Sequence, residues 1–497
     1  MEIQFEKKPC SCLRWVLCEV QTQEQTQEVK LGDSMPDVGR VLACWGQPVL
    51  RSKEWRGDGM SVSGGVMTWT LYAPEDGTEP RCVESWIPFQ MKWSFPQTER
   101  EGTMAASCLL RSAAARSVSA RKLMVRVCVS ALGEAMEPWE AEVASAGELP
   151  EDIQVLQNTY PMQLPVESGE KSFLIDEDLP WEGNLAPARI IRYEFQPMLQ
   201  EQRVLGDRLV FRGSGRLFLL YRTEEGEIRS RTFDVPFSQF VDLDQDHGDD
   251  AVAHVIPMVT SLELEPEENR LRLKVGMVAQ YVIFERHNIQ LTEDAYSPNR
   301  AVSVQEEALA LPAMLDSRQE NIRVQQSAPA GAEKILDCCF LPDFPVQRRS
   351  GEEVSLELPG VFQALYLDEN GSLSGCSVKC SHQMTINADD DACIRLRLGA
   401  VGGVQASGGP EGIQFSGDYP LQCSTVSGKA LPMVTGLEAG ELTEPDPARP
   451  SLILRRNCEQ GLWNLAKASG STVEAIREAN HLTGEPEMGR LLLIPVP

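Results

Sequence analysis

The chain is 497 residues long, and 46 Lys and Arg against 73 Asp and Glu give it a net charge of −27. With 42% hydrophobic and 24% charged residues it has the composition of a globular protein with several cores, which excludes a disordered or collagen-like chain. The acidic charge excludes a general nucleic-acid-binding surface, which needs clustered Lys and Arg. No apolar run approaches the roughly 18 residues of a membrane-spanning helix, and no export signal is visible. We therefore expect a cytoplasmic protein without a transmembrane segment.

Three segments of the chain share one strand–turn–strand pattern. In each, an apolar strand ends at a tyrosine and a turn containing glycine follows: Tyr72 before Asp76-Gly77, Tyr221 before Glu225-Gly226, and Tyr366 before Asn370-Gly371. The tyrosines are roughly 150 residues apart, and such a constant spacing is the mark of an internal repeat. We predict a mainly β protein with three repeated antiparallel units, sandwich-like, at 1–150, 165–300 and 301–435, the third divergent.

Alternation of apolar and polar residues predicts the strands of the second unit in most detail. Residues 209–221 and 228–235 alternate on either side of Glu225-Gly226, which predicts a hairpin. Residues 262–264 and 271–282 flank a turn at 266–269 and predict a second strand pair.

The pattern changes after a Pro-rich stretch at 436–450, which we expect to be a solvated, flexible linker. Residues 461–469 have helical periodicity, and Ser471 with Glu474 forms a capping box that opens a second helix through Asn480.

Short apolar strands at 452–454 and 491–495 flank these two helices. Residues 451–497 are therefore predicted to form a small, separate βααβ module. Its buried residues should be Leu462, Leu465, Ile476, Leu491 and Ile494.

No catalytic, metal or cofactor site is predicted. The 14 cysteines form no CxxC motif and the five histidines no HxxxH motif, so reduced thiols without a metal are expected. The acidic segment from Asp242 begins like a calcium loop, but His247 and Ala253 stand where such a loop needs Gly and Glu. Phosphate-binding glycine loops and a G-x-S-x-G elbow are also missing. We expect a protein that is not an enzyme.

The C-terminal module resembles a LysM domain over nearly its whole length. The resemblance is carried by Gly461-Leu-Trp463, by 472–476, by Asn480 and by the run from Gly489 to Pro495. LysM domains commonly bind N-acetylglucosamine glycans in a groove between the first loop and the loop after the second helix. The resemblance implies a partner- or glycan-binding groove made of Glu459, Gln460, Gly461, Trp463, Asn480 and Gly489.

The repeats resemble the SPOCS domains of endospore-forming bacteria. The matching segments are 187–191, 201–206 and 235–239 in the second unit, with weaker counterparts in the other two. SPOCS repeats followed by a LysM domain are the architecture of the SipL-type spore morphogenetic family. This resemblance implies a non-enzymatic scaffold in the mother-cell cytoplasm, at the forespore surface. It would bind the ATPase of the coat basement layer and support coat attachment and cortex formation.

Two interpretations of the LysM-like module stay open. Without an export signal the module should contact a protein, and the replacement of the usual Gly-Asp-Thr by Glu459-Gln460-Gly461 agrees with this. The alternative is a cell-wall or spore-cortex protein that binds peptidoglycan. Trp463 is either the aromatic anchor of an interface or a core residue of the first helix.

Overall fold

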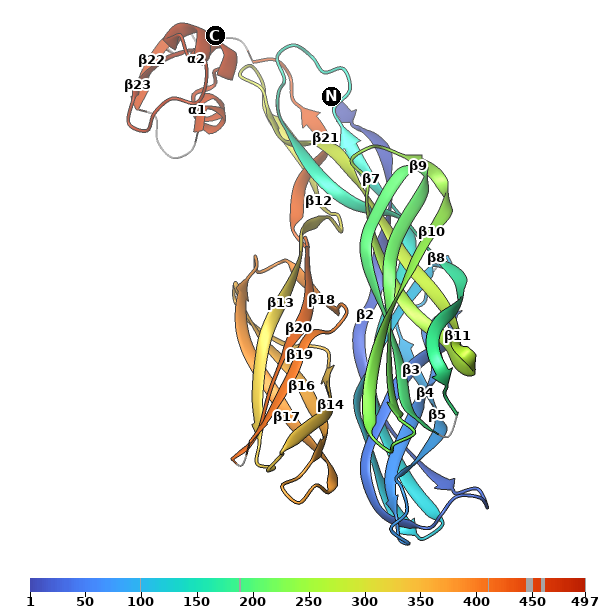
Figure 1. Cartoon of the computed structure of the whole chain (residues 1–497). Helices are drawn as coiled ribbons and strands as arrows, with labels where there is room; N and C mark the ends of the chain where they lie inside the picture. Colours follow the sequence, from blue (N-terminus) through green and yellow to red (C-terminus); the bar gives the residue numbers. More distant parts are fainter. Residues whose placement is uncertain (99, 187–188, 410, 444–449, 457–460, 497) are drawn as a thin grey trace.

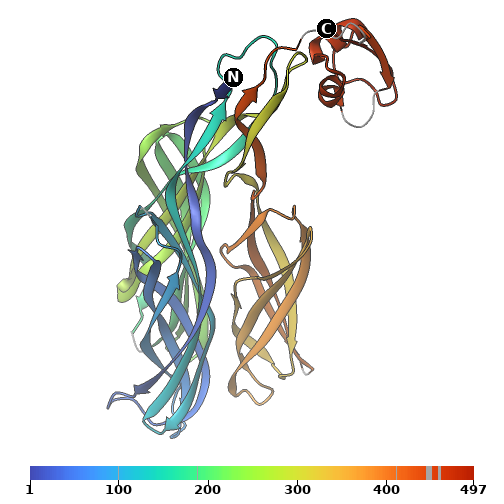
Figure 2. The same ribbon diagram turned by 180° about the vertical axis from the view of Figure 1, so that it is seen from behind.

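The computed structural model describes every residue except 99, 187–188, 410, 444–449, 457–460 and 497. It confirms a mainly β protein with multiple antiparallel sheets and two short helices near the C-terminus. Figures 1 and 2 show two elongated β parts side by side, a larger one built from the first 300 residues and a smaller one from the segment after residue 310. The C-terminal module lies at one end of the molecule. Neither helix in the described ranges is long and apolar enough to cross a membrane.

The first part of the chain forms two facing sheets. Their orders are β2-β7-β6 and β3-β4-β5, and the two share one core in which Val62, Val66, Val125 and Val127 are fully buried. This is the sandwich arrangement that alternating strands predict. The strands are β1 (Glu2–Gln4), β2 (Glu6–Lys30), β3 (Val38–Arg56), β4 (Gly59–Pro74), β5 (Arg81–Ser94), β6 (Thr103–Ser119) and β7 (Lys122–Ser145).

The second part of the chain consists of four long strands. They are β8 (Gln154–Asn184), β9 (Ile190–Arg222), β10 (Ile228–His247) and β11 (Val252–Tyr296). Strands β9 and β10 form the predicted hairpin, and β8 pairs with β11 along nearly its whole length. Within β11, Asn269 has a φ of 61°, and Gly276 N donates to Ser261 Oγ at 3.1 Å. The chain therefore folds back at the predicted second turn, and the two halves of β11 lie side by side.

The third part shares sheets with the other two. Its β13 joins β8 where Met314 pairs with Gln163, which gives a six-stranded sheet in the order β11-β8-β13-β20-β18 with β19 attached to β20. Strand β1 pairs with β21, and β12 pairs with the other edge of β21. The strands are β12 (Val302–Ala310), β13 (Met314–Ala328), β14 (Lys334–Pro342), β15 (Val346–Ser350), β16 (Glu353–Leu367), β17 (Leu373–Asn387), β18 (Cys393–Leu398), β19 (Gly402–Gly409), β20 (Gly412–Val426) and β21 (Ala430–Ala439).

The three predicted hairpin turns are confirmed. They join β4 to β5, β9 to β10 and β16 to β17, each an antiparallel pair. Gly77, Gly226 and Gly371 have φ values of 71°, 85° and 72°, a region that suits glycine because it has no Cβ. The amide of each glycine donates to the carbonyl three residues earlier, at 3.3, 3.2 and 2.9 Å. The same turn therefore recurs at equivalent places in the three parts.

The C-terminal module has the predicted βααβ order. Strand β22 (Leu452–Arg456) pairs antiparallel with β23 (Leu491–Pro495), and helices α1 (Gly461–Ser469) and α2 (Val473–Asn480) lie between them in sequence. The buried residues of the module include Leu462, Leu465, Ile476 and Ile494, as predicted.

Two local predictions in this module are wrong. Leu491 is 53% exposed and Leu492 is fully buried, because side chains alternate along a strand and β23 turns its even-numbered residues inward. The cap of α2 is Thr472, whose Oγ1 accepts from Ala475 N at 3.1 Å. Ser471 is buried instead and donates its hydroxyl to the carbonyl of Pro495.

The stretch expected to be a linker is partly bound to the body. Strand β21 continues to Ala439, inside the predicted linker at 436–450. Beyond it, Gly440 N donates to Ala301 O at 2.9 Å and Thr443 N donates to Asn299 O at 2.8 Å. The remainder of the linker, 444–449, lies outside the described residues.

Candidate functional site

The structure brings the start of α1 close to the segment after α2, and these are the two sides of the predicted groove. Glu459 and Gln460 fall outside the described residues, and Gly461 begins α1 with a φ of 71°. Leu462 N donates to Glu485 Oε2 at 3.3 Å, so the loop after α2 lies against the start of α1. Within the described residues, the start of α1 and the segment after Asn480 are therefore neighbours.

The side-chain amide of Asn480 forms hydrogen bonds within the module. Its Nδ2 donates to Ile476 O at 2.8 Å and to Leu493 O at 2.5 Å, and its Oδ1 accepts from Leu493 N at 2.8 Å. This amide joins the end of α2 to β23. Gly489, with a φ of 81°, lies in the turn before β23, where its carbonyl accepts from Arg456 Nη1 at 3.4 Å. Both residues hold the module together.

Trp463 points toward the body of the protein. Its Nε1 donates to Asp294 Oδ2 at 2.7 Å, and its ring meets the ring of Tyr296 edge-on, with centroids 4.8 Å apart. Lys467, one helical turn further along α1, places its Nζ 2.7 and 2.8 Å from the two oxygens of Asp294. Helix α1 is therefore docked on the end of β11 in the structure.

Tyr296 of the body completes the core of the module. It is buried in one cluster with Leu462, Leu465 and Ile476, and its hydroxyl donates to Ser471 O at 2.9 Å. Burial, together with the charge of Asp294, raises the pKa of Tyr296 to about 12. A register shift in β11 just before Asp294 sets the direction of both side chains, which is a usual effect of a β-bulge.

Sequence reasoning found Trp463 but missed Asp294 and Tyr296. No local signal marks these two residues, because their partners lie some 170 positions away in the chain. An acidic residue and a tyrosine at the end of a strand are ordinary in an acidic β protein.

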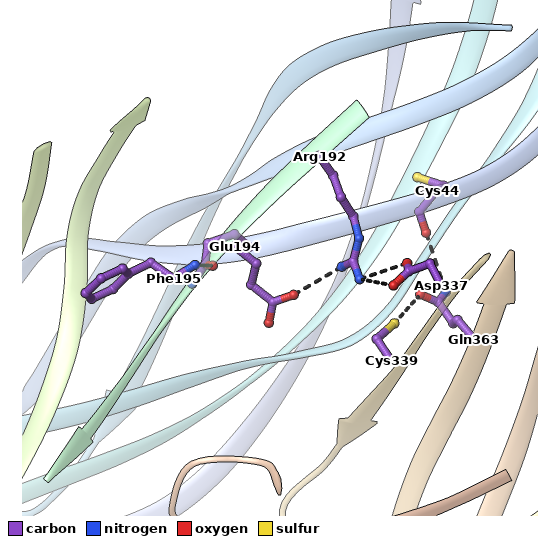
Figure 3. A network of polar contacts seen from close by, with 8 residues as sticks. Cys44, Arg192, Glu194, Phe195, Asp337, Cys339 and Gln363 are labelled. Atoms are coloured by element: carbon purple, nitrogen blue, oxygen red, sulfur yellow. Dashed lines mark hydrogen bonds and ion pairs between the residues drawn. The ribbon is translucent and has the colours of Figure 1, made fainter. Parts of the chain in front are cut away.

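A second polar centre lies inside the body and is shown in Figure 3. The guanidinium of Arg192 on β9 meets both carboxylate oxygens of Asp337 on β14 at 2.9 and 3.2 Å, and Glu194 at 3.1 Å. Although burial alone would lower it, the charge of Asp337 raises the pKa of Arg192 above its ordinary value. The guanidinium also lies over the rings of Trp45 and Phe218. Its charge is thus paired and enclosed.

Gln363 extends this centre to all three parts of the chain. Its Nε2 lies 3.5 Å from Cys44 O and 3.4 Å from Ala113 O, and its Oε1 accepts from Cys339 Sγ at 3.5 Å. Burial raises the pKa of the Cys339 thiol, which keeps it protonated and unreactive. Strands of the first, second and third parts of the chain therefore meet at this polar centre.

A second buried ion pair joins β7 to β18. Arg397 donates to the two oxygens of Glu134 at 2.9 and 2.7 Å. His254 of β11 lies close by, and burial followed by the charge of Arg397 lowers its pKa to about 4. This histidine is therefore neutral at physiological pH, and the cluster has a structural rather than an acid–base character.

The acidic segment that begins like a calcium loop forms the end of β10. His247 is buried there, and its Nε2 lies 3.1 Å from Glu167 Oε2. Across the described ranges, no group of three or more His, Cys, Asp or Glu residues is placed to hold a metal ion.

Comparison with known families gives one match. Residues 188–265, which span β9, β10 and the first part of β11, match the family described as SipL, SPOCS domain. This segment is thus similar to SPOCS domains, as the resemblance of the second unit implied. No curated protein and no solved structure matched the chain.

Proposed function

We propose that this protein is a non-enzymatic assembly scaffold of sporulation, of the SipL type. The observation that carries the proposal is the SPOCS match at 188–265, in the part of the chain whose hairpin turn recurs at Gly77 and Gly371. The scaffold acts in the mother-cell cytoplasm at the forespore surface. Its LysM-like module and SPOCS units bind the ATPase of the coat basement layer, and this binding supports coat attachment and cortex formation.

The charged groups of the body favour a structural role. Arg192 with Asp337 and Arg397 with Glu134 are buried pairs that face each other across strands of different parts. Buried charges must be paired to be tolerated, and such pairs fix the relative position of the groups that carry them. A body held in this way offers a partner a surface of fixed shape.

A protein partner suits the LysM-like module better than a glycan. Sugar hydroxyls need polar groups that are free to hydrogen-bond. The amide of Asn480 is bound to β23 and α2, and the indole N–H of Trp463 is bound to Asp294. These contacts leave the predicted groove with fewer polar groups for a sugar.

The test compares the two kinds of partner directly. The full-length chain is immobilised, and binding of the purified coat ATPase is measured by biolayer interferometry. In parallel, co-sedimentation of the soluble chain with purified peptidoglycan is measured. We expect saturable binding to the ATPase and no enrichment in the peptidoglycan pellet. Tight binding to peptidoglycan without binding to the ATPase would replace the scaffold with the cell-wall alternative.

A further inference from the structure

A cleft of about 430 Å³ lies where the second and third parts of the chain meet. Gln163 of β8, Gln202 of β9 and His254 of β11 line it from the second part, and the first residues of β13 line it from the third. Gln202 and His254 belong to the segment that matches the SPOCS family. The cleft is therefore formed by the SPOCS-like segment and the third part together, outside the C-terminal module.

Four glutamine side chains line this cleft: Gln163, Gln202, Gln319 and Gln422. Gln202 Oε1 accepts from Val255 N at 3.0 Å, which fixes one amide at the wall. Among the described residues, the other three side-chain amides have no hydrogen-bond partner. Gln319 and Gln422 are opposite each other on β13 and β20, so two of these amides are adjacent. An amide has both a donor and an acceptor, and it can therefore bind a peptide group.

Two exposed aliphatic side chains also line the cleft. They are Val252 at the start of β11 and Leu315 on β13, which are 41% and 55% exposed. The pairing of β13 with β20 shifts between Met314 and Asp316, so Leu315 is the extra residue of a β-bulge. Bulges redirect side chains and are frequent beside functional sites. The cleft therefore offers a contact for an aliphatic side chain of a ligand next to its amides.

One edge of β13 has no partner strand along most of its length. In the described chain, β13 pairs with β20 over its whole length on one side, but with β8 at Met314 alone on the other. Gln163, the residue of β8 that pairs with Met314, lines the cleft together with the first residues of β13. Unpaired backbone groups at such an edge can bind an extended peptide as an added strand. The strand edge therefore favours an extended peptide as the ligand.

Charge narrows the class of ligand further. Among the described residues, Asp316 has no ion-pair partner, whereas Arg318 already pairs with Glu320 at 3.3 Å. His254 adds no positive charge at physiological pH, because burial and the charge of Arg397 lower its pKa to about 4. The unpaired carboxylate attracts a basic group, and the charge of −27 on the whole chain disfavours an anionic ligand.

A glycan fits this lining less well than a peptide. Ligand pockets commonly provide aromatic side chains against which a ring can pack. None of the described residues that line this cleft is Trp, Tyr or Phe. Free amides, aliphatic contacts and an open strand edge are instead the features that bind an extended peptide.

We propose that this cleft is a peptide-binding site. It binds an extended segment along the open edge of β13, with an aliphatic side chain against Leu315 and Val252 and a Lys or Arg beside Asp316. The glutamine amides bind the peptide groups of the segment and fix its register. The inference goes beyond the proposed function, because it depends neither on the coat ATPase nor on the C-terminal module.

The first step of the test identifies peptides that bind the full-length chain. The purified chain is panned against a phage-displayed library of random linear peptides, and binding of each selected peptide is measured by fluorescence polarisation. We expect selected peptides that combine an aliphatic residue with Lys or Arg and contain no proline within that segment, because proline cannot donate to a strand edge. Selection of acidic peptides, or of no peptide, would overturn the inference.

The second step locates the selected peptide with full-length variants. The double change Gln319→Ala and Gln422→Ala removes two amides and should lower the affinity about tenfold. Asp316→Lys should lower it about tenfold at low salt and less at high salt. The matched controls are Gln325→Ala on β13 and Glu265→Lys on β11, which are outside the lining of the cleft and should bind like the parent.

Circular dichroism and the melting temperature establish that every variant is folded like the parent. Equal binding by the parent and both cleft variants would show that the peptide binds elsewhere, which overturns the inference. A soluble N-acetylglucosamine tetramer is the second probe. We expect it to leave the bound peptide in place, and displacement of the peptide by the tetramer would assign the cleft to a glycan instead.

Discussion

The ion pair inside the body and the ion pair between the body and the C-terminal module differ in how deeply they are buried. Within the body, the Arg192–Asp337 pair that joins two parts has side chains only 4% and 2% exposed. Between body and module, the Lys467–Asp294 pair has side chains 43% and 20% exposed. Breaking a buried pair leaves an uncompensated charge in the interior, whereas a partly solvated pair is screened and contributes little. The difference indicates that buried charge joins the parts of the body, whereas the docked module relies on the buried ring of Tyr296 and only a partly solvated ion pair.

The largest effect should come from the buried pair. Asp337→Ala leaves the guanidinium of Arg192 buried without its carboxylate, and we expect a loss of about 3–5 kcal/mol in unfolding free energy. Chemical denaturation followed by circular dichroism measures it. The control is Asp176→Ala, which removes an exposed partner of Arg272 and should cost about 0–1 kcal/mol. Equal costs for the two changes would contradict the contrast between buried and exposed pairs.

A second prediction tests the core of the module. Leu492→Ala should destabilise the module by about 2–5 kcal/mol, because it leaves a cavity at a fully buried position. Leu491→Ala, at the adjacent exposed position, should change its stability by less than about 0.5 kcal/mol. Hydrogen exchange of α1 and α2 in the full-length chain reports both. Faster exchange in the Leu491→Ala variant than in the Leu492→Ala variant would mean that β23 turns its odd-numbered residues inward.

The third prediction concerns how the unfolding free energy of the body depends on pH. The folded-state pKa of His254, at about 4, lies below the ordinary value near 6.5, so the unfolded chain binds the proton more readily. This contribution to stability is complete above pH 6.5 and falls by an amount on the order of 1–3 kcal/mol as the pH is lowered to about 4. His254→Gln should flatten that part of the curve of unfolding free energy against pH. An unchanged slope would show that Glu134 and other carboxylates cause the acid sensitivity.

The smallest effect should come from the docking contact. Tyr296→Phe removes one hydrogen bond to Ser471 O and should cost about 1 kcal/mol of local stability. Amide exchange in 461–471 should rise severalfold, with the melting temperature of the body unchanged. Tyr160→Phe is the control, because its hydroxyl donates to Glu293, a residue of the body. A rise of equal size in the control would mean that the effect is not specific to docking.

The features that could be predicted from the sequence are those that local residue patterns determine. The glycine turns at 77, 226 and 371 follow from residue type and spacing, and so do the two helices of the module. Contacts between distant segments could not be predicted, because neither Asp294 nor Asp337 has a neighbour in sequence that indicates its partner. A run of three leucines has no alternation from which to read the inward side, so the pattern predicts Leu491 in the core where the structure has Leu492.

The pairing of β1 with β21 has a consequence for synthesis. Gln4 is placed opposite Gly436, and Ile3 opposite Leu437, so β1 leaves the ribosome long before its partner strand β21. At about 5–20 residues per second, that wait lasts roughly 20 to 90 seconds. During this interval the edge that β21 will cover is open on the nascent chain, and a chaperone or a neighbouring nascent chain can reach it. The sheet beside the module is therefore completed only after β21 has been synthesised, and an interruption of translation before residue 430 would leave it open.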